Sequence, residues 1–284
     1  MKYDLVNTTS TKENNLELEV RRFDWDFEGV PRVWCLNSPD LTHLLNTLSL
    51  VAPAFEDWAI PSVRRVMEEI GNPDLKQEAR SFVGQEAHHS LAHKKFNKEV
   101  LLESHGFDLT EIERDICGII EYAESLNDQN QVALVMAGEH FLSNLGDWYL
   151  NDVRENNILD AKANKLFTWH MAEEIEHTAI VYDVYDSIYG EGSASRLIKY
   201  KTMMLATSLV TKGLYKIWKN LMDQESQMSD GYNVNSSMKN FTLVMRCAAK
   251  YFTRYMSYYS PGFHPWDHNG NVGLLKSLLK DIQS

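Results

Sequence analysis

The sequence predicts an all-α protein, built as a four-helix bundle with additional C-terminal helices. Three observations lead to this prediction. Apolar residues recur at helical spacing over long stretches, strand-like alternation is scarce, and the stretches end at glycine, asparagine or proline. The 284 residues are enough for one large core, and 44% hydrophobic and 24% charged residues are ordinary for a globular chain.

The chain is expected to begin with an irregular N-terminal arm, residues 1–37, whose aromatic side chains pack onto the rest of the protein. The first long helix is predicted over about residues 38–70. Ser38-Pro39 marks its start, because serine can cap a helix and proline suits the first turn. The second is predicted over about residues 73–106, with Asn72 as its cap.

A shorter helix follows over about residues 108–126, opened by Asp108 or Thr110. The next long helix is predicted over about residues 128–155. Another long helix covers about residues 159–189 and ends at Gly190, a residue type common just after helices.

Beyond residue 190, further helices are predicted over about residues 193–225, 238–256 and 272–282, separated by polar or proline-containing segments. The expected organisation is therefore the arm and a single helical domain. The domain covers residues 38–284, with the bundle at about 38–190 and capping helices at about 191–284.

Each of the four long predicted helices carries a glutamate at mid-length in its apolar stripe. Two of these helices contribute single glutamates, Glu56 and Glu139, and the other two contribute Glu86-x-x-His89 and Glu174-x-x-His177. A carboxylate in an apolar core is costly unless its charge is compensated. Two divalent cations would offset the four carboxylates, and the imidazoles would complete their coordination. The competing interpretation is that these residues lie on solvated helix faces, where Glu–His pairs are common.

This doubled pattern resembles the ferritin-like di-iron carboxylate superfamily over about residues 40–190. The resemblance implies a ferritin-like four-helix bundle. It also implies that Glu86 and Glu174 are bridging or terminal carboxylates, that Glu56 and Glu139 are the single glutamates, and that His89 and His177 each bind one iron.

His170 precedes Glu174 by four residues, and this spacing resembles arylamine N-oxygenases of the p-aminobenzoate N-oxygenase type. That resemblance implies a seventh metal ligand at His170; the alternative is a core histidine bonded to a nearby carboxylate. The wider context, residues 82–97 and 261–265, resembles a bacterial family of predicted metal-dependent hydrolases.

Several other residues are candidates for supporting roles. His93 is expected either to orient a ligand or to be a packed core histidine. Asp147 and Asp183 are candidate acceptors for a ligating imidazole, whereas His140 points elsewhere on its helix. His88, Glu173 and Glu176 are expected at the surface or in salt bridges. An aromatic run is interpreted as core or as substrate-pocket wall: Tyr251, Phe252, Tyr255, Tyr258 and Tyr259.

The predicted function is a non-haem di-iron oxygenase or oxidase that activates O₂ to oxidise a small organic substrate. Carboxylate and imidazole ligands without thiolate suit two iron ions, with manganese as the alternative metal. Electrons would come from a ferredoxin or a reductase, because the sequence has no flavin or iron–sulfur motif. The alternatives are a dimetal-dependent hydrolase, iron oxidation and storage of the ferritin type, and a purely structural bundle.

The bulk composition excludes some partners. A net charge of -12 argues against nucleic acid, which needs a basic surface. Three widely spaced cysteines and a polar N-terminus lead us to expect a cytoplasmic protein without disulfides or a signal peptide. No apolar stretch is long enough for a transmembrane segment. A homodimer is the expected oligomer.

Overall fold

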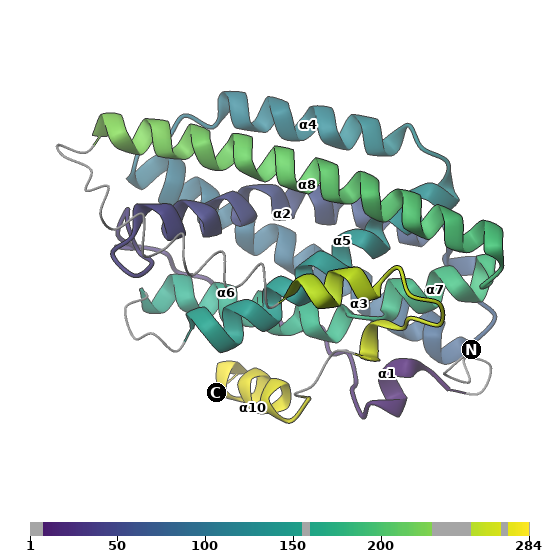
Figure 1. The fold of residues 1–284 in the computed structure, drawn as a ribbon. Helices are drawn as coiled ribbons and strands as arrows, with labels where there is room; N and C mark the ends of the chain where they lie inside the picture. Colours follow the sequence, from purple (N-terminus) through teal and green to yellow (C-terminus); the bar gives the residue numbers. More distant parts are fainter. Residues whose placement is uncertain (1–7, 155–159, 229–250, 268–271, 284) are drawn as a thin grey trace.

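The computed structural model describes residues 8–154, 160–228, 251–267 and 272–283. These residues form helices and no strand (Figure 1), which confirms the all-α prediction. The long helices of the bundle are α2 (Pro39–Val66), α3 (Pro73–Phe96), α5 (Asp128–Trp148) and the consecutive pair α6 (Ala161–His177) and α7 (Ile180–Tyr189).

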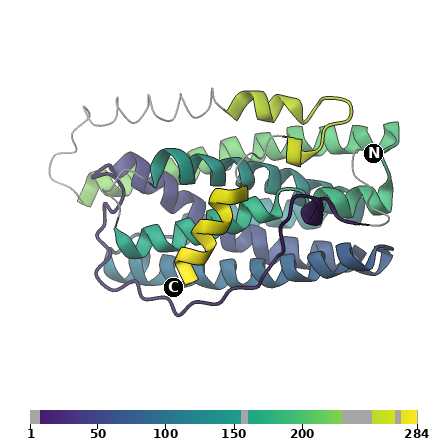
Figure 2. The same cartoon turned by 90° about the horizontal axis from the view of Figure 1, so that it is seen from below.

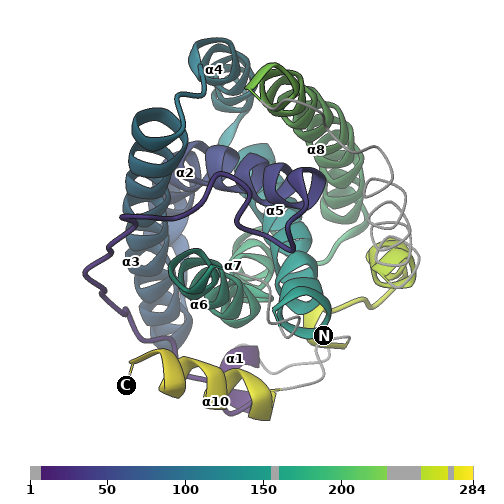
Figure 3. The same cartoon turned by 90° about the vertical axis from the view of Figure 1, so that its left-hand side faces the viewer.

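The bundle closes because each long helix packs on two neighbours. Helix α2 packs on α3 and α5, and the α6–α7 pair packs on both α3 and α5. Figure 3 shows these helices end-on around a common centre. Two more helices form an outer layer: α8 (Ser193–Met228) lies against α2 and α5, and α4 (Thr110–Glu124) lies against α2 and α8.

The helix starts follow the local chemistry expected of them. The Ser38 hydroxyl accepts a hydrogen bond from the backbone N–H of Leu41, and Asn72 caps α3 by accepting from two backbone N–H groups. Helix α4 begins at Thr110, whose N–H donates to the Asp108 carboxylate at 2.9 Å. These caps confirm the predicted starts of the first two long helices.

The prediction of one helix over residues 159–189 is wrong. The chain forms two helices, with Thr178 and Ala179 between them. At the break, the Thr178 N–H donates to the Ile175 carbonyl, 3.4 Å away and three residues back, instead of the four of an α-helix. The interruption comes directly after His177.

The predicted helices over residues 73–106 and 128–155 also change character near their ends. Each leaves the α-helical pattern and continues as a π-helical segment, Asn97–Ser104 after α3 and Tyr149–Val153 after α5. The first helix ends in a short 3₁₀ segment, Met67–Glu69.

Segments from both ends of the chain cover one face of the bundle. Figure 2 shows the N-terminal arm and α10 (Val272–Gln283) on this face. Helix α10 packs on α6, and the short α1 (Ser10–Glu13) packs on α7. Of the helix predicted over residues 238–256, only 251–256 are described, and they are helical; the remainder lies outside the described residues.

Among the described residues, no helix combines the length and the hydropathy that crossing a lipid bilayer requires.

Two apolar clusters fill the bundle, one towards each end. One cluster contains Leu45 of α2 and Phe167 of α6, and the other contains Val63 of α2 and Val181 of α7. On α2, Glu56 lies between the residues of the two clusters. The bundle therefore has a polar layer at mid-length, with apolar packing on both sides of it.

Candidate metal centre

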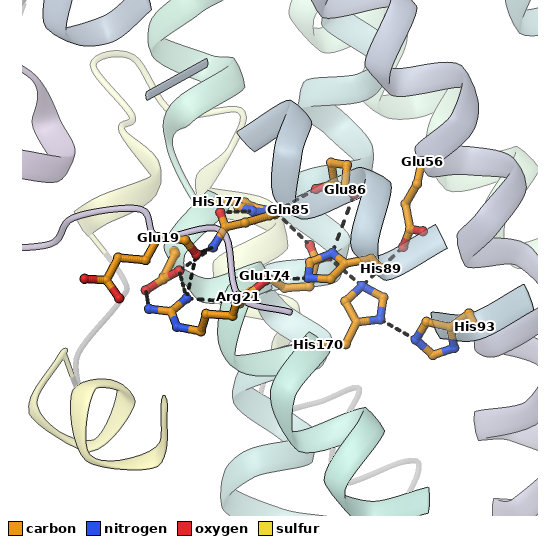
Figure 4. A network of polar contacts seen from close by, with 12 residues as sticks. Glu19, Arg21, Glu56, Gln85, Glu86, His89, His93, His170, Glu174 and His177 are labelled. Atoms are coloured by element: carbon orange, nitrogen blue, oxygen red, sulfur yellow. Dashed lines mark hydrogen bonds and ion pairs between the residues drawn. The ribbon is translucent and has the colours of Figure 1, made fainter. Parts of the chain in front are cut away.

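The polar layer brings all seven predicted ligands together, and Figure 4 labels all of them except Glu139. Helix α2 supplies Glu56, and α5 supplies Glu139. Helix α3 supplies Glu86 and His89, and α6 supplies the remaining three, His170, Glu174 and His177. Their exposed fractions are between 0% and 2%, so every one of them is withdrawn from water. The solvated-face interpretation is therefore wrong for these residues.

One half of the cluster is built around the third imidazole. Nε2 of His170 lies 2.7 Å from Oε1 of Glu174 and 3.3 Å from Oε1 of Glu56. Nδ1 of His89 lies 3.5 Å from the same Glu174 oxygen and 3.7 Å from Oε2 of Glu86. Two imidazole nitrogens and three carboxylates thus face one small space.

The other half is built around His177. Its Nδ1 lies 2.8 Å from Oε1 of Glu86, 3.6 Å from Oε2 of Glu139 and 3.7 Å from Oε2 of Glu174. Glu86 and Glu174 therefore each turn one oxygen towards either half. This is the arrangement in which a carboxylate can bridge two metal ions.

The donor atoms of the cluster are better suited to binding metal ions than to pairing with one another by hydrogen bonds. Nine oxygen and nitrogen atoms of the cluster are buried without a hydrogen-bond partner, and they belong to Glu56, Glu86, His89, Glu139, Glu174 and His177. Buried polar atoms of this kind are rare unless an ion or water satisfies them. Within each of two sets of residues, the four donor atoms all lie within 4.8 Å of one another. One set is Glu56, His89, His170 and Glu174, and the other is Glu86, His89, Glu174 and His177.

The single glutamates show how strongly the cluster needs positive charge. Burial, and then the charge of Glu86, raise the pKa of Glu56 well above its usual value. Burial and the charge of Glu174 do the same to the pKa of Glu139. The like charges of the neighbouring carboxylates thus oppose ionisation, as expected for carboxyl groups that share one site.

The histidines respond in the opposite sense. Burial alone would lower the pKa of His89, but the hydrogen bond to Glu173 and the nearby carboxylates of Glu174 and Glu86 raise it well above its usual value. The pKa of His177 is raised in the same way, mainly by the charge of Glu86. The carboxylates therefore attract protons to the imidazoles, and divalent cations would supply the same positive charge.

Hydrogen bonds hold the outer nitrogens of two of these imidazoles. Nε2 of His89 lies 2.9 Å from Oε2 of Glu173, and Nε2 of His177 lies 3.0 Å from Oε1 of Gln85. With a proton on each outer nitrogen, the inner Nδ1 keeps a lone pair directed at the cluster. Such outer partners fix the tautomer and the ring orientation of metal-binding histidines.

The N-terminal arm completes this outer layer. Arg21 is 8% exposed and donates to Glu173 at 2.9 Å and to Glu176 at 2.9 and 3.1 Å. Gln85 donates to Glu176 at 2.8 Å. The expected salt bridges of Glu173 and Glu176 are present, but a surface position is wrong for both, because the arm covers the side of α6 on which they lie. His88 is half-buried.

His170 is held by a chain of hydrogen bonds. Its Nδ1 lies 2.6 Å from Nε2 of His93, whose Nδ1 lies 2.7 Å from the Ser49 hydroxyl. Ser49 donates to the Asn97 side-chain carbonyl at 2.6 Å. If Nε2 of His170 keeps its lone pair for the cluster, each donor in this chain finds an acceptor. His93 therefore orients His170, one of its two predicted roles.

The predicted aspartate partners bind other groups. Asp183 accepts hydrogen bonds from Ser10 and, at 3.0 Å, from His264, and Asp147 accepts from Tyr251 at 2.8 Å. Their predicted contact with a ligating imidazole is therefore wrong: Asp183 faces α1 and the 264 segment, and Asp147 faces residue 251. His140 points away from the cluster as expected and contacts the rings of Tyr258 and Phe263.

The aromatic run has mixed environments. Tyr251 and Tyr258 are buried as core residues, whereas Phe252 is 59% exposed, so neither predicted role suits it. Sequence reasoning missed four residues of the outer layer, Arg21, Ser49, Gln85 and Asn97, and it also missed the burial of Glu173. The position of Gln85 directly before Glu86 was a sequence signal for its place in the outer layer. The sequence contained no such signal for Arg21 of the arm.

Comparison with known proteins gives one family. The model of a family described as "Predicted metal-dependent hydrolase" matches residues 19–269. Neither the curated proteins nor the solved structures yield a match. The matched range contains all seven residues of the cluster and the arm residue Arg21.

Proposed function

Because the chain belongs to the family of predicted metal-dependent hydrolases, we propose that its buried glutamate–histidine cluster binds two divalent metal ions and hydrolyses a small organic substrate. The observation that carries this proposal is the convergence of nine buried donor atoms without hydrogen-bond partners. Four carboxylates and three imidazoles match the charge and the donor types of a two-metal site.

The distances within the cluster indicate how the residues would divide between the ions. Glu86 and Glu174 would bridge, since each has one oxygen in either half of the cluster. Glu56 and His170 would complete one site, and the other site would be completed by two further residues, Glu139 and His177. His89 adjoins both bridging carboxylates. When bound, two such ions polarise a scissile bond and activate water for its attack.

The protein's own contribution is orientation and exclusion of bulk water. Glu173, Gln85 and His93 each hold the outer nitrogen of one imidazole, so that the inner nitrogen is presented in a fixed direction. The apolar clusters on both sides of the polar layer limit the access of water to the centre.

Metal stoichiometry and anaerobic hydrolysis test this proposal together. We expect the metal-free protein to bind two Zn²⁺ or Mn²⁺ ions per chain and to hydrolyse members of a panel of esters and amides without O₂. Glu174→Gln should lose both properties, because it removes the charge of a bridging carboxylate, whereas the exposed-site variant Glu121→Gln should keep them. Two bound ions in Glu174→Gln would contradict the assignment of the cluster.

A di-iron oxygenase is the second candidate, because the same ligand set also suits two iron ions. The donors are carboxylates and imidazoles on buried helices, and neither described cysteine, Cys35 or Cys117, belongs to the cluster. This agrees with the proposed relation to ferritin-like di-iron proteins, whose chemistry would use O₂ and an external electron donor. O₂ uptake by the Fe²⁺-loaded protein, without anaerobic hydrolysis by the Zn²⁺ form, would favour this candidate over hydrolysis.

A further inference from the structure

An apolar cavity of about 150 Å³ lies between the bundle and its outer layer. Its walls come from α2, α4, α5 and α8, and the lining residues in the described part of the chain are all apolar or glycine. Almost all of the polar groups of these residues are backbone N–H and C=O groups, which are already hydrogen-bonded within the helices. Apolar walls of this kind favour apolar ligands, and about 150 Å³ is enough for a molecule the size of benzene.

The cavity adjoins one side of the metal centre. Ala52 lines it and lies four residues before Glu56, and Leu142 lines it and lies three residues after Glu139. Residues at these spacings are neighbours on one helix face. The helices that carry the single glutamates therefore also form the cavity wall, whereas α3 and α6, which supply the imidazoles, contribute no lining residue.

Two residues of the cavity wall lie directly next to cluster residues in the sequence. Phe55 and Gly138 both line the cavity and are the immediate sequence neighbours of Glu56 and Glu139. A Cβ atom at position 138 would lie 2.3 Å from Cζ of Phe55, so the ring lies directly against the glycine backbone. The Phe55 ring can lie in this position because residue 138 has no side chain.

We propose that this cavity binds the apolar part of the substrate, an aromatic ring of benzene size or a short alkyl chain. The reacting polar group would then lie at the end of the cavity next to Glu56 and Glu139. A ligand of this kind gains dispersion contacts that the cavity walls otherwise lack. The assignment of this ligand as substrate rests on the proposed two-metal function; the binding of an apolar molecule does not.

Toluene binding tests the cavity without any catalytic assay. Trp58 lines the cavity and its indole N–H is buried without a hydrogen-bond partner, so its NMR signal is a local reporter. Trp58→Phe assigns that signal. We expect toluene to shift it and to raise the melting temperature of the wild-type chain. No shift and no change in melting temperature would overturn the proposal.

A filled cavity should lose this ligand. Val210 of α8 lines the cavity, so Val210→Phe places a ring in it, and we expect toluene to bind at least about tenfold more weakly, equivalent to about 1.4 kcal/mol. The matched control is Met204→Phe on the same helix, where the side chain is 64% exposed and the cavity is not touched. Equal toluene affinity in the two variants would contradict the assigned location.

Two further measurements separate this proposal from the metal assignment. Val210→Phe should still bind two Zn²⁺ ions, and Glu174→Gln should still bind toluene. Among methyl, butyl and benzyl acetates, wild type should favour the larger groups by about tenfold in kcat/KM, and Val210→Phe should lose that preference. Toluene binding without any hydrolysis would overturn the hydrolase function and leave the apolar site intact, whereas hydrolysis without size preference would overturn the substrate-binding role.

Discussion

His170 differs from the other two imidazoles in the nitrogen that it turns inward. It presents Nε2 to the cluster and keeps Nδ1 for His93, whereas His89 and His177 present Nδ1. Its orientation therefore depends on one chain of hydrogen bonds that passes through His93 to Ser49. This dependence makes the first prediction specific to one half of the metal centre.

We expect His93→Leu to weaken metal binding by about 10–100-fold at the site that contains His170. The substitution removes the acceptor that fixes the His170 ring, while the half around His177 keeps its own partner, Gln85. Zn²⁺ titration by calorimetry would show one weakened and one unchanged site. His105→Leu, which changes a histidine bonded to the Val30 carbonyl, is the control; identical titrations of the two variants would rule out the positioning role.

Glu78 provides a pH-dependent test outside the metal centre. Burial raises its pKa to about 7 from a usual 4.5, although Thr9 donates a hydrogen bond to it. The folded chain therefore binds this proton more tightly than the unfolded chain. Its contribution to stability is fully present below about pH 4.5 and is lost as the pH rises to about 7, which amounts to about 2–3 kcal/mol.

Glu78→Gln should remove this loss. We expect the metal-free variant to be about 2 kcal/mol more stable than wild type at pH 8, and the two to have similar stability at pH 4.5. Urea unfolding at both pH values measures the difference. A stability difference that does not change with pH would show that Glu78 ionises in the folded chain as it does in water.

The seven candidate ligands were predictable because each lies within a helical pattern that the sequence itself contains. Three- and four-residue spacing identifies residues that share a helix face, whatever the rest of the fold is. The outer partners have no such local signal. Arg21 and Glu173 are 152 positions apart, and only the docking of the arm on α6 brings them together.

At the level of helices, α5 and α6 approach each other closely at Gly146. A Cβ atom there would lie 2.6 Å from the backbone carbonyl oxygen of Met171, which is the residue after His170. Neither helix can relieve this contact by rotating a side chain. The spacing of α5 and α6, and with it the position of His170, therefore depends on a glycine.

We expect Gly146→Ala to destabilise the protein by about 1–3 kcal/mol, because the helices must separate to admit the methyl group. The control is Gly118→Ala in α4, where a Cβ atom would meet nothing within 4 Å; there the greater helix propensity of alanine should stabilise by up to about 1 kcal/mol. Denaturant unfolding of both variants compares them. Equal effects of the two substitutions would contradict the close approach of α5 and α6.

The break between α6 and α7 shows what apolar spacing cannot reveal. Val181 and Val184 are buried and continue the stripe that contains His177, so the sequence predicts one uninterrupted helix. The stripe records which side chains are buried, whereas the break is a change in the backbone hydrogen bond of Thr178. A local rearrangement of this kind leaves the order of buried residues intact.

For the molecule as a whole, metal binding at the polar layer would be linked to folding. Four buried carboxylates converge there, between two apolar clusters. Ions that bind only the folded chain would stabilise it, by about 2.7 kcal/mol per site at 100 times the dissociation constant. The all-α class and the bundle were predictable, but the apolar cavity was not, because it depends on how four helices fit together.

We expect saturating Zn²⁺ or Mn²⁺ to raise the melting temperature of the metal-free protein, and a chelator to reverse the change. Glu174→Gln should abolish the response, since its side chain serves both halves of the cluster, and Glu121→Gln should retain it. Differential scanning calorimetry measures the shift. A wild-type melting temperature that is independent of metal would favour a purely structural bundle.

The position of Arg21 has a consequence for attempts to transplant the centre into another protein. A fragment that starts at residue 38 would contain every candidate ligand, yet it would lack the guanidinium that lies between Glu173 and Glu176. Glu173 and Glu176 would then lose their counterion. Glu173, which accepts the hydrogen bond from His89, would also lose the guanidinium that holds it in place. The smallest transferable unit is therefore the bundle together with its N-terminal arm.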